Sequence, residues 1–412
     1  MTRIAGRALS VALSIALWLG ALELGLRVFW KKQLLLGAGI EDPHFHHRLK
    51  PLKTYQFTSQ EFHAETRTNR YGLRGPDPVI PKPPGTFRIL MLGDSFTFGF
   101  PVRDEETFCA LAQRFLREGG YHSVEVVNGG VSGYAPTLHY ISLRDQYLTF
   151  EPDLVVLWLD LGDVQEDAWF QKNLVYDERG NIVRCDPYYI NGRYAWWLRV
   201  QEHSALCSYI QAKLLNTLAK TRILGVGGYL QVWLRGERAK VAIARLKRQQ
   251  QAPDLASADR FLLVREDATR ELVAPAWALS ARYLSMIRDL LASRGIPLVI
   301  GVYPYGMVAG PDQWAEGRTY WGFEPGRTYD ASLALSLVSD FARDNALPLV
   351  STYGAFREAA RGAKLFYDGD GHMTPAGQSL VAETLVRDPG FVGLLQRRFA
   401  GRSLAALSRA AD

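Results

Sequence analysis

The chain has 412 residues, of which 48% are hydrophobic and 22% are charged, and its formal net charge is +6. These values are those of a folded protein with one large domain, or with a domain that carries a sizeable insertion. The lysines and arginines are scattered, which argues against nucleic acid as a partner, and three cysteines are too few for a disulfide framework.

The three cysteines have different expected environments. Cys185 and Cys207 could form a pair in an oxidising compartment. Cys109 lies inside a helical pattern, where a small buried hydrophobe is expected. The weakly basic charge balance fits an anionic polymer and a membrane surface equally well.

An uninterrupted apolar or small run covers residues 8–22, and the span 8–30 is long enough to cross a bilayer, for which about 20 residues are needed. Basic residues flank it on both sides, so the charge rule leaves its orientation open. A cleaved signal peptide is the alternative, but no clean small-x-small cleavage site follows the run. We expect residues 1–32 to be an uncleaved single-pass anchor in the inner membrane, with the remaining chain on the periplasmic, extracytoplasmic side.

Residues 33–86 form a lead-in that is rich in proline, histidine and threonine. His44, His46 and His47 resemble a metal cluster, but no carboxylate or cysteine stands near them at ligand spacing. We therefore expect a solvated loop there and no metal site. The stretch 68–75 and the prolines after it predict an extended segment packed on the domain.

From Phe87 onward, buried-type apolar runs alternate with helical patterns. The expected strands cover residues 87–92, 124–127, 154–159, 298–302 and 347–350. The expected helices cover residues 104–118, 136–147, 275–293 and 330–343, and a last one opens at Thr374-Pro375. Because the first three strands end in Gly, Asp, Ser or Asn, we expect an open α/β sheet with polar groups along one crevice.

This alternation is interrupted between residues 165 and 270, which we interpret as an insertion or cap over the crevice. It contains the aromatic residues Tyr188, Tyr189, Tyr194, Trp196 and Trp197, a helical pattern over 204–220, and a basic segment over 235–248. The aromatic side chains could stack on sugar rings or could form a small core of the insertion itself. A membrane-facing role for residues 222–248 is a weaker alternative.

Three residues could form a nucleophilic site. Ser95 follows the strand that ends at Gly93, and a serine hydroxyl becomes a nucleophile when a base lies within reach and an acid orients that base. His372 and Asp370 lie in a glycine-rich loop before the last helix. Taken singly, each residue could instead cap a helix or shape a turn; together they predict a Ser95–His372–Asp370 triad.

These residues resemble the sequence blocks of the SGNH hydrolases, also called GDSL-type esterases. Gly93-Asp94-Ser95 matches the first block and residues 128–133 match the second, and the resemblance covers about residues 66–163 and 275–390. It implies a three-layer α/β/α domain (87–164 and 271–400) with a mostly parallel, flavodoxin-like sheet. It also implies an oxyanion hole that includes Ser95, Gly133 and the third-block position Gly162, and no cofactor.

Two blocks depart from the pattern of that family. The third block normally has an asparagine whose amide donates to the oxyanion, and Gly162 stands in its place. Loss of one such donor typically lowers the rate by roughly 10²–10³-fold. The last block is one residue shorter than usual, as in similar membrane-anchored members of bacterial polysaccharide clusters, and Asp368 is the alternative orienter of His372.

Three functions follow from the resemblance. The first is a membrane-anchored serine esterase that hydrolyses carboxylic esters, acetyl esters above all, on a small molecule or a cell-surface polysaccharide. The second is a polysaccharide O-acyltransferase with the same triad, and the third is a degenerate domain that binds glycan without chemistry. No pattern in the chain predicts the long acyl groove of a lipase.

Overall fold

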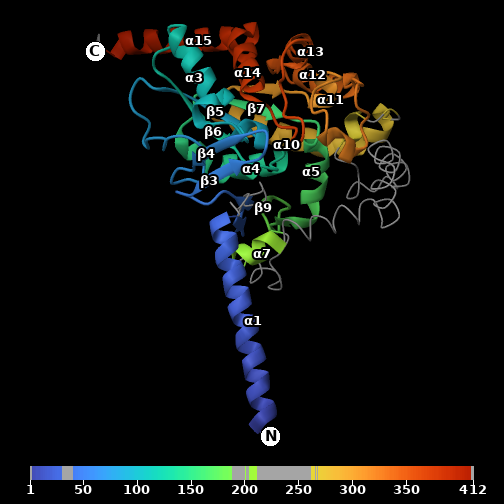
Figure 1. The fold of residues 1–412 in the computed structure, drawn as a ribbon. Coiled ribbons are helices and arrows are strands. Elements are labelled where there is room, and N and C mark those ends of the chain that lie inside the picture. The colour runs from blue at the N-terminus through green and yellow to red at the C-terminus, as the bar shows by residue number, and fades with distance from the viewer. Residues whose placement is uncertain are drawn as a thin grey trace.

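The computed structural model describes residues 2–29, 40–187, 200, 204–210, 261–264, 266 and 268–409 (Figure 1). In this part of the chain, five strands form one parallel sheet. They are β5 (Phe87–Gly93), β6 (Val124–Gly130), β7 (Leu154–Leu159), β10 (Leu298–Val302) and β11 (Leu349–Ser351). Their order in space, β6-β5-β7-β10-β11, is the flavodoxin-like order 2-1-3-4-5. The predicted parallel α/β sheet is confirmed.

Helices cover both faces of this sheet, as right-handed crossovers between parallel strands require. On one face, α14 (Pro375–Arg387) packs against α3 (Phe108–Glu118), and α15 (Pro389–Arg409) continues beside them. On the other face, α10 (Arg270–Ala292) packs against α4 (Pro136–Asp145), α5 (Asp163–Phe170) and α12 (Ser332–Asp344). The predicted three-layer α/β/α architecture is therefore confirmed.

The shorter helices are α2 (Ser95–Phe98), α7 (Ala205–Ile210), α11 (Gly306–Ala309), α13 (Tyr353–Ala359), and the 3-10 turns η1 (Asp104–Glu106), η2 (Tyr147–Phe150), η3 (Gln171–Asn173), η6 (Leu262–Val264) and η7 (Gly317–Trp321).

The helix boundaries differ most from the prediction at the starts of two helices. The expected helix over 104–118 is a 3-10 turn followed by α3, because the Thr107 hydroxyl caps α3 by accepting the N–H of Ala110. The expected start at Pro275 is wrong: α10 begins at Arg270, where the Thr269 hydroxyl accepts the N–H of Leu272. Thr269 is therefore the N-cap, and the helix includes Pro275 in its second turn.

The lead-in contains two antiparallel strand pairs that were not predicted. The expected solvated loop at His44, His46 and His47 is wrong, because His46 and His47 lie in a strand and His46 is buried. The first pair is β1 (Ile40–Asp42) with β2 (His46–Arg48), and the second is β3 (Thr54–Thr58) with β4 (His63–Arg67). Burial alternates along β3 and β4, and the inward-facing residues of the second pair include Tyr55, Phe57 and Ala64. This period of two was present in the sequence, but each strand is only a few residues long.

The predicted insertion begins inside α5, which spans residue 165 and packs against α10. Beyond it, β8 (Leu174–Tyr176) and β9 (Ile182–Cys185) pair antiparallel. The aromatic stretch 188–197 and the basic segment 235–248 lie outside the described residues, and so does most of the helix expected over 204–220. Cys109, Cys185 and Cys207 are all free thiols.

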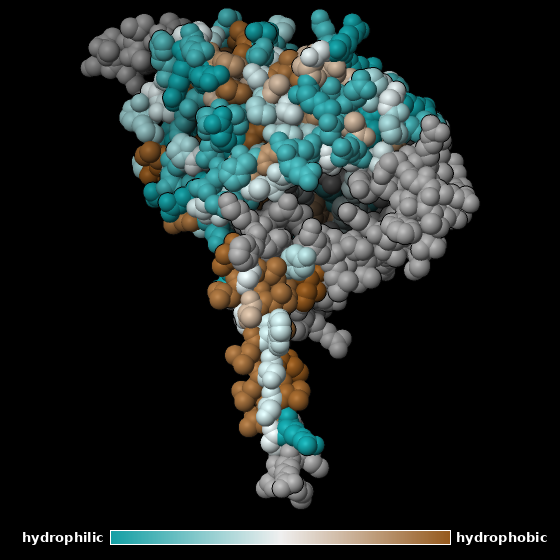
Figure 2. All heavy atoms as spheres, in the orientation of Figure 1, coloured by the Kyte–Doolittle hydropathy of each residue, from teal (hydrophilic) through white to brown (hydrophobic). Residues whose placement is uncertain are grey.

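The N-terminal helix α1 (Thr2–Phe29) extends away from the domain (Figure 1). Its segment Leu9–Val28 is the single helix in the described part of the chain that is long and apolar enough to cross a membrane. Figure 2 shows hydrophobic side chains along its exposed length. A membrane anchor and a signal sequence both have these properties.

Candidate active site

Ser95 is the first residue of α2, and only Asp94 separates it from the end of β5. The Asp94 carboxylate caps this short helix by accepting the N–H of Phe96 at 2.9 Å, and Gly99 ends it in the left-handed conformation. Strand β6 passes close by: a Cβ on Gly130 would lie only 2.2 Å from the nitrogen of Phe98. Glycine at this position therefore lets the turn that holds Ser95 pack directly onto the end of β6.

His372 and Asp370 lie in the loop before α14, and the fold brings them to Ser95. His372 Nε2 is 2.8 Å from Ser95 Oγ, and His372 Nδ1 is 2.5 Å from Asp370 Oδ1. Gly371, between the two residues, has a φ of 90°, a conformation that side-chain-bearing residues rarely adopt. This turn lets the Asp370 carboxylate reach the ring of a residue only two positions away.

The charges in this arrangement favour one tautomer of His372. Burial raises the pKa of Asp370, but the neighbouring His372 charge and its hydrogen bonds outweigh burial, so the net pKa is lowered. An ionised carboxylate can only accept hydrogen bonds, so Nδ1 carries the proton and donates to Asp370. Nε2 is then free to accept the hydroxyl proton of Ser95. The His372 ring is further held by Phe96 and Phe100, at centroid distances of 5.0 and 4.9 Å.

Asp368, the alternative orienter, has other partners. Its Oδ1 accepts the N–H of Ala315 at 3.0 Å and pairs with Lys364 Nζ at 2.5 Å. Its carbonyl oxygen accepts the N–H groups of Glu316 and Gly317. These contacts give Asp368 a role in holding the loop, and Asp370 is the acid bound to His372.

Two of the three predicted oxyanion donors are available. Within the described part of the chain, the backbone N–H groups of Ser95 and Gly133 have no hydrogen-bond acceptor. The N–H of Gly162 instead donates to Asp160 Oδ1, which also accepts the N–H of Asp163 at 3.0 Å. Donation from Gly162 to an oxyanion would require this bond to break, so the structure does not support that predicted role.

Asp160 belongs to a group of buried acids that two tyrosines contact, and these contacts were not predicted from the sequence. The hydroxyl of Tyr305 donates to Asp160 Oδ2, and that of Tyr303 donates to Asp94 Oδ1, each at 2.6 Å. Burial, together with the charge of Asp160, raises the pKa values of Asp94 and Asp163 well above the ordinary range. Tyr303 follows the last residue of β10 and Tyr305 lies two residues further on, so their position at the polar edge of the sheet was available as a signal.

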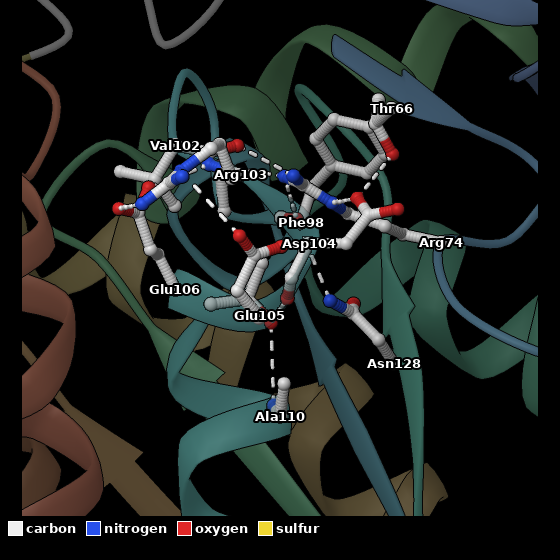
Figure 3. A network of polar contacts seen from close by, with 12 residues as sticks. Thr66, Arg74, Phe98, Val102, Arg103, Asp104, Glu105, Glu106, Ala110 and Asn128 are labelled. Atoms are coloured by element: carbon white, nitrogen blue, oxygen red, sulfur yellow. Dashed lines mark hydrogen bonds and ion pairs between the residues drawn. The ribbon is translucent and has the colours of Figure 1, made fainter. Parts of the chain in front are cut away.

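A network around Arg74 supports the turn after Ser95 (Figure 3). This buried guanidinium donates to the carbonyl groups of Gly99 and Val102, at 2.6 and 2.5 Å, and pairs with Asp104 at 2.6 Å. The Asn128 side chain donates to the Thr97 carbonyl from the other side at 3.0 Å. A residue of the lead-in thus closes the loop that carries the predicted nucleophile.

The lead-in histidines contact the loop that contains Gly133. His47 Nε2 is 2.8 Å from the carbonyl oxygen of Ser132, and the Tyr134 hydroxyl donates to the His47 carbonyl at 2.7 Å. His46 is bonded to His47 through their Nδ1 atoms, whereas His44 pairs with Asp145. In the part of the chain that the structure describes, no group of three or more histidines, cysteines or acids is arranged to hold a metal ion.

No protein-family model matches the chain, and none of the curated proteins compared with it matches. Among solved structures, it is similar to the acetyl xylan esterase AlAXEase, with 12% identity and a TM-score of 0.36 over 72% of this chain and 97% of that chain. It is also similar to a lipolytic protein of the G-D-S-L family from Desulfitobacterium hafniense DCB-2, with 11% identity and a TM-score of 0.36 over 73% of this chain and 99% of that chain. For Axe2, an acetylxylan esterase from Geobacillus stearothermophilus, the identity is 14% and the TM-score 0.34 over 74% of this chain and 94% of that chain. Because these TM-scores are low, we draw no conclusion about the function of this chain from the three similarities.

Proposed function

We propose that the chain is a carboxylic ester hydrolase of the SGNH type in which Ser95 is the nucleophile, His372 the base and Asp370 its orienting acid. The observation that supports this most is the continuous contact Ser95 Oγ–His372 Nε2 and His372 Nδ1–Asp370 Oδ1, at 2.8 and 2.5 Å. Both distances lie at or near the range required for proton transfer during catalysis.

The proposed reaction proceeds through an acyl-serine. His372 Nε2 takes the Ser95 proton while Oγ bonds to the ester carbonyl carbon, and Asp370 stabilises the imidazolium. The N–H groups of Ser95 and Gly133 donate to the oxyanion. The intermediate breaks its bond to the alcohol oxygen, which receives the proton from His372. A water molecule then loses a proton to His372 and attacks the acyl carbon, and the acid leaves as Ser95 regains its hydrogen.

The substrate that we propose is a short acyl ester, acetyl above all, on a small molecule or a cell-surface polysaccharide. Residues 1–32 would anchor the enzyme in the inner membrane, with the hydrolase domain on the periplasmic side. This proposal follows from the resemblance of the sequence blocks and from the apolar helix α1.

Replacing the proposed nucleophile tests the reaction. With full-length protein in detergent and p-nitrophenyl acetate as the substrate, we expect Ser95→Ala to lower kcat by about 10³-fold or more and to abolish labelling by a fluorophosphonate probe. Ser123→Ala is the matched control, since Ser123 is exposed just before β6 and should leave both readouts unchanged. Undiminished hydrolysis by Ser95→Ala would remove Ser95 from the mechanism.

A second assay separates hydrolysis of the ester from transfer of its acyl group. An acetylated oligosaccharide is offered together with an unacetylated acceptor, and the products are identified by mass. We expect acetate release to water, whereas acetyl groups found on the acceptor would identify an O-acyltransferase with the same triad. Glycan binding by a wild-type protein that the fluorophosphonate probe does not label would identify a degenerate domain.

A further inference from the structure

Glu61 lies at the tip of the β3–β4 hairpin, far from the predicted catalytic segments in sequence. The turn is closed by the Ser59 N–H, which donates to the carbonyl of Phe62 at 2.9 Å. The Ser59 hydroxyl accepts the N–H groups of Glu61 and Phe62, at 3.0 and 3.2 Å. These bonds fix the backbone from which the Glu61 side chain extends.

The Glu61 carboxylate binds three consecutive backbone N–H groups in the loop before α14. Oε1 accepts the N–H of Asp368 at 2.5 Å, and Oε2 accepts those of Gly369 and Asp370, at 3.0 and 3.2 Å. A Cβ on Gly369 would lie 3.0 Å from Oε2, tighter than most contacts of this kind, so glycine leaves room for the carboxylate. Successive N–H groups that converge on one anion form a concave site for negative charge.

This loop carries both the acid and the base of the proposed triad. The N–H of Asp370 is bound to Glu61, while its carboxylate accepts hydrogen bonds from the His372 backbone and ring. The neighbouring Phe62 adds apolar contacts, with ring centroids 5.1 Å from Tyr367 and 5.8 Å from Phe100. The hairpin tip therefore contacts the loop through its backbone and through Tyr367, and it also contacts Phe100, whose ring packs against that of His372.

We propose that Glu61 is a positioning residue that sets the Asp370 carboxylate, and through it the His372 ring, against Ser95. This inference rests on the proposed function. Hydrogen bonds to a charged acceptor are roughly twice as strong as neutral ones, so three of them restrict the backbone from 368 to 370. A displacement of about 1 Å at a reacting group can lower a rate by about 10²-fold. Glu61 thus acts on the chemistry without touching the substrate.

Kinetics of full-length variants in detergent provide the first test. We expect Glu61→Ala to lower kcat for p-nitrophenyl acetate by about 10–10²-fold, with KM within about twofold of wild type. Glu61→Gln keeps one acceptor oxygen of the same size and should retain an intermediate kcat. Glu65→Gln is the matched control, because Glu65 lies on the same hairpin and bonds to Gln56; its kcat should be unchanged.

A spectroscopic test does not depend on turnover. In protein labelled with ¹⁵N-histidine, the proton between His372 Nδ1 and Asp370 should give a downfield NMR resonance, assigned by its loss in His372→Gln. We expect this resonance to broaden or shift in Glu61→Ala and Glu61→Gln, and to be retained in Glu65→Gln. The isosteric Glu61→Gln keeps this test decisive if the alanine variant does not fold.

The two proposals fail in different ways. If Ser95→Ala hydrolyses ester as fast as wild type, the proposed function fails, while the His372 resonance still reports on Glu61. If Ser95 is required but Glu61→Gln and Glu61→Ala match Glu65→Gln in both kcat and resonance, the role of Glu61 is overturned.

Discussion

Gly162 stands where the resembling family has an amide-bearing asparagine, and its neighbours explain how the chain folds without one. Its backbone is close to helical, with φ −85° and ψ −21°, and it precedes α5. Asp160 binds the N–H groups of Gly162 and Asp163 and is itself bound by Tyr305. A buried carboxylate thus organises the turn.

Restoring the amide tests what this position contributes. We expect Gly162→Asn to raise kcat by about tenfold or more, because an added donor at an oxyanion is worth up to roughly 10²–10³-fold. An asparagine can adopt the observed backbone angles. The measurement is kcat for p-nitrophenyl acetate, with Gly162→Ala as the control that adds a Cβ but no donor. Equal rates for the two variants would show that the site gains nothing from an amide here.

The α4 helix carries a buried histidine, His139, from which we expect a loss of stability in acid. Both ring nitrogens of His139 lack a hydrogen-bond partner among the described residues, and burial lowers its pKa to about 3. In the unfolded chain a histidine titrates near pH 6.5. Between these two values the unfolded state binds the proton and the folded state does not. The contribution to stability is therefore complete above about pH 6.5 and is lost as the pH falls toward 3.

Removing the imidazole should flatten this dependence. We expect the free energy of unfolding of His139→Leu to fall less steeply between pH 6 and pH 4 than that of wild type, by about 1.4 kcal/mol per pH unit. Denaturant unfolding at several pH values measures the slope. The control is His122→Leu, at an exposed position, which should keep the wild-type slope. If His139→Leu has the same slope as wild type, His139 is not the source of the expected loss of stability in acid.

The lead-in segment 40–86 contacts all three parts of the site, although it precedes every predicted catalytic block. His47 binds the loop of Gly133, Arg74 binds the turn after Ser95, and Glu61 binds the loop of Asp370. From the sequence, a solvated loop was expected at His44, His46 and His47, and an extended segment over residues 68–75 and the prolines after them. The hairpins are short, and their function lies in contacts with residues up to 309 positions away, which no local pattern encodes.

Helix α1 contains the proposed membrane-spanning segment, and the two charged residues near its C-terminal end, Glu23 and Arg27, have partners. Glu23 pairs with Arg27 at 2.7 Å and accepts the N–H groups of Ala205 and Leu206, at 2.8 and 2.9 Å, while the Ser204 hydroxyl donates to it at 2.8 Å. Charged groups near a bilayer are tolerated when they are paired in this way.

Membrane attachment gives a prediction for the entire chain. The full-length protein should remain in the membrane pellet after alkaline carbonate extraction, because about 20 apolar residues span the hydrocarbon core. Its domain should be degraded by protease added to spheroplasts with intact inner membranes. A variant that lacks residues 1–32 should appear in the soluble fraction. Recovery of full-length protein in the carbonate supernatant, or cleavage after the apolar run, would contradict an uncleaved anchor.

The sequence by itself indicated the five strands of the sheet and the polar residues at the ends of the first three. Apolar runs such as residues 89–92 form strands that are buried on both faces, and glycines such as Gly93 end these strands. Both features depend on neighbouring residues in the sequence. The candidates Ser95, Asp370 and His372 came from the same local signals, and their catalytic roles stay predictions.

Only the tertiary structure decided which groups meet. In the fold, His372 contacts Asp370, whereas Asp368 has other partners. The N–H of Gly162 donates to Asp160, and Glu61 of the β3–β4 hairpin accepts N–H groups of the loop before α14. Tyr303 and Tyr305 donate hydrogen bonds to the buried Asp94 and Asp160. The physical reason is that a hydrogen-bond partner is chosen by the packing of distant segments, whereas a strand or a turn is encoded by its neighbours in sequence.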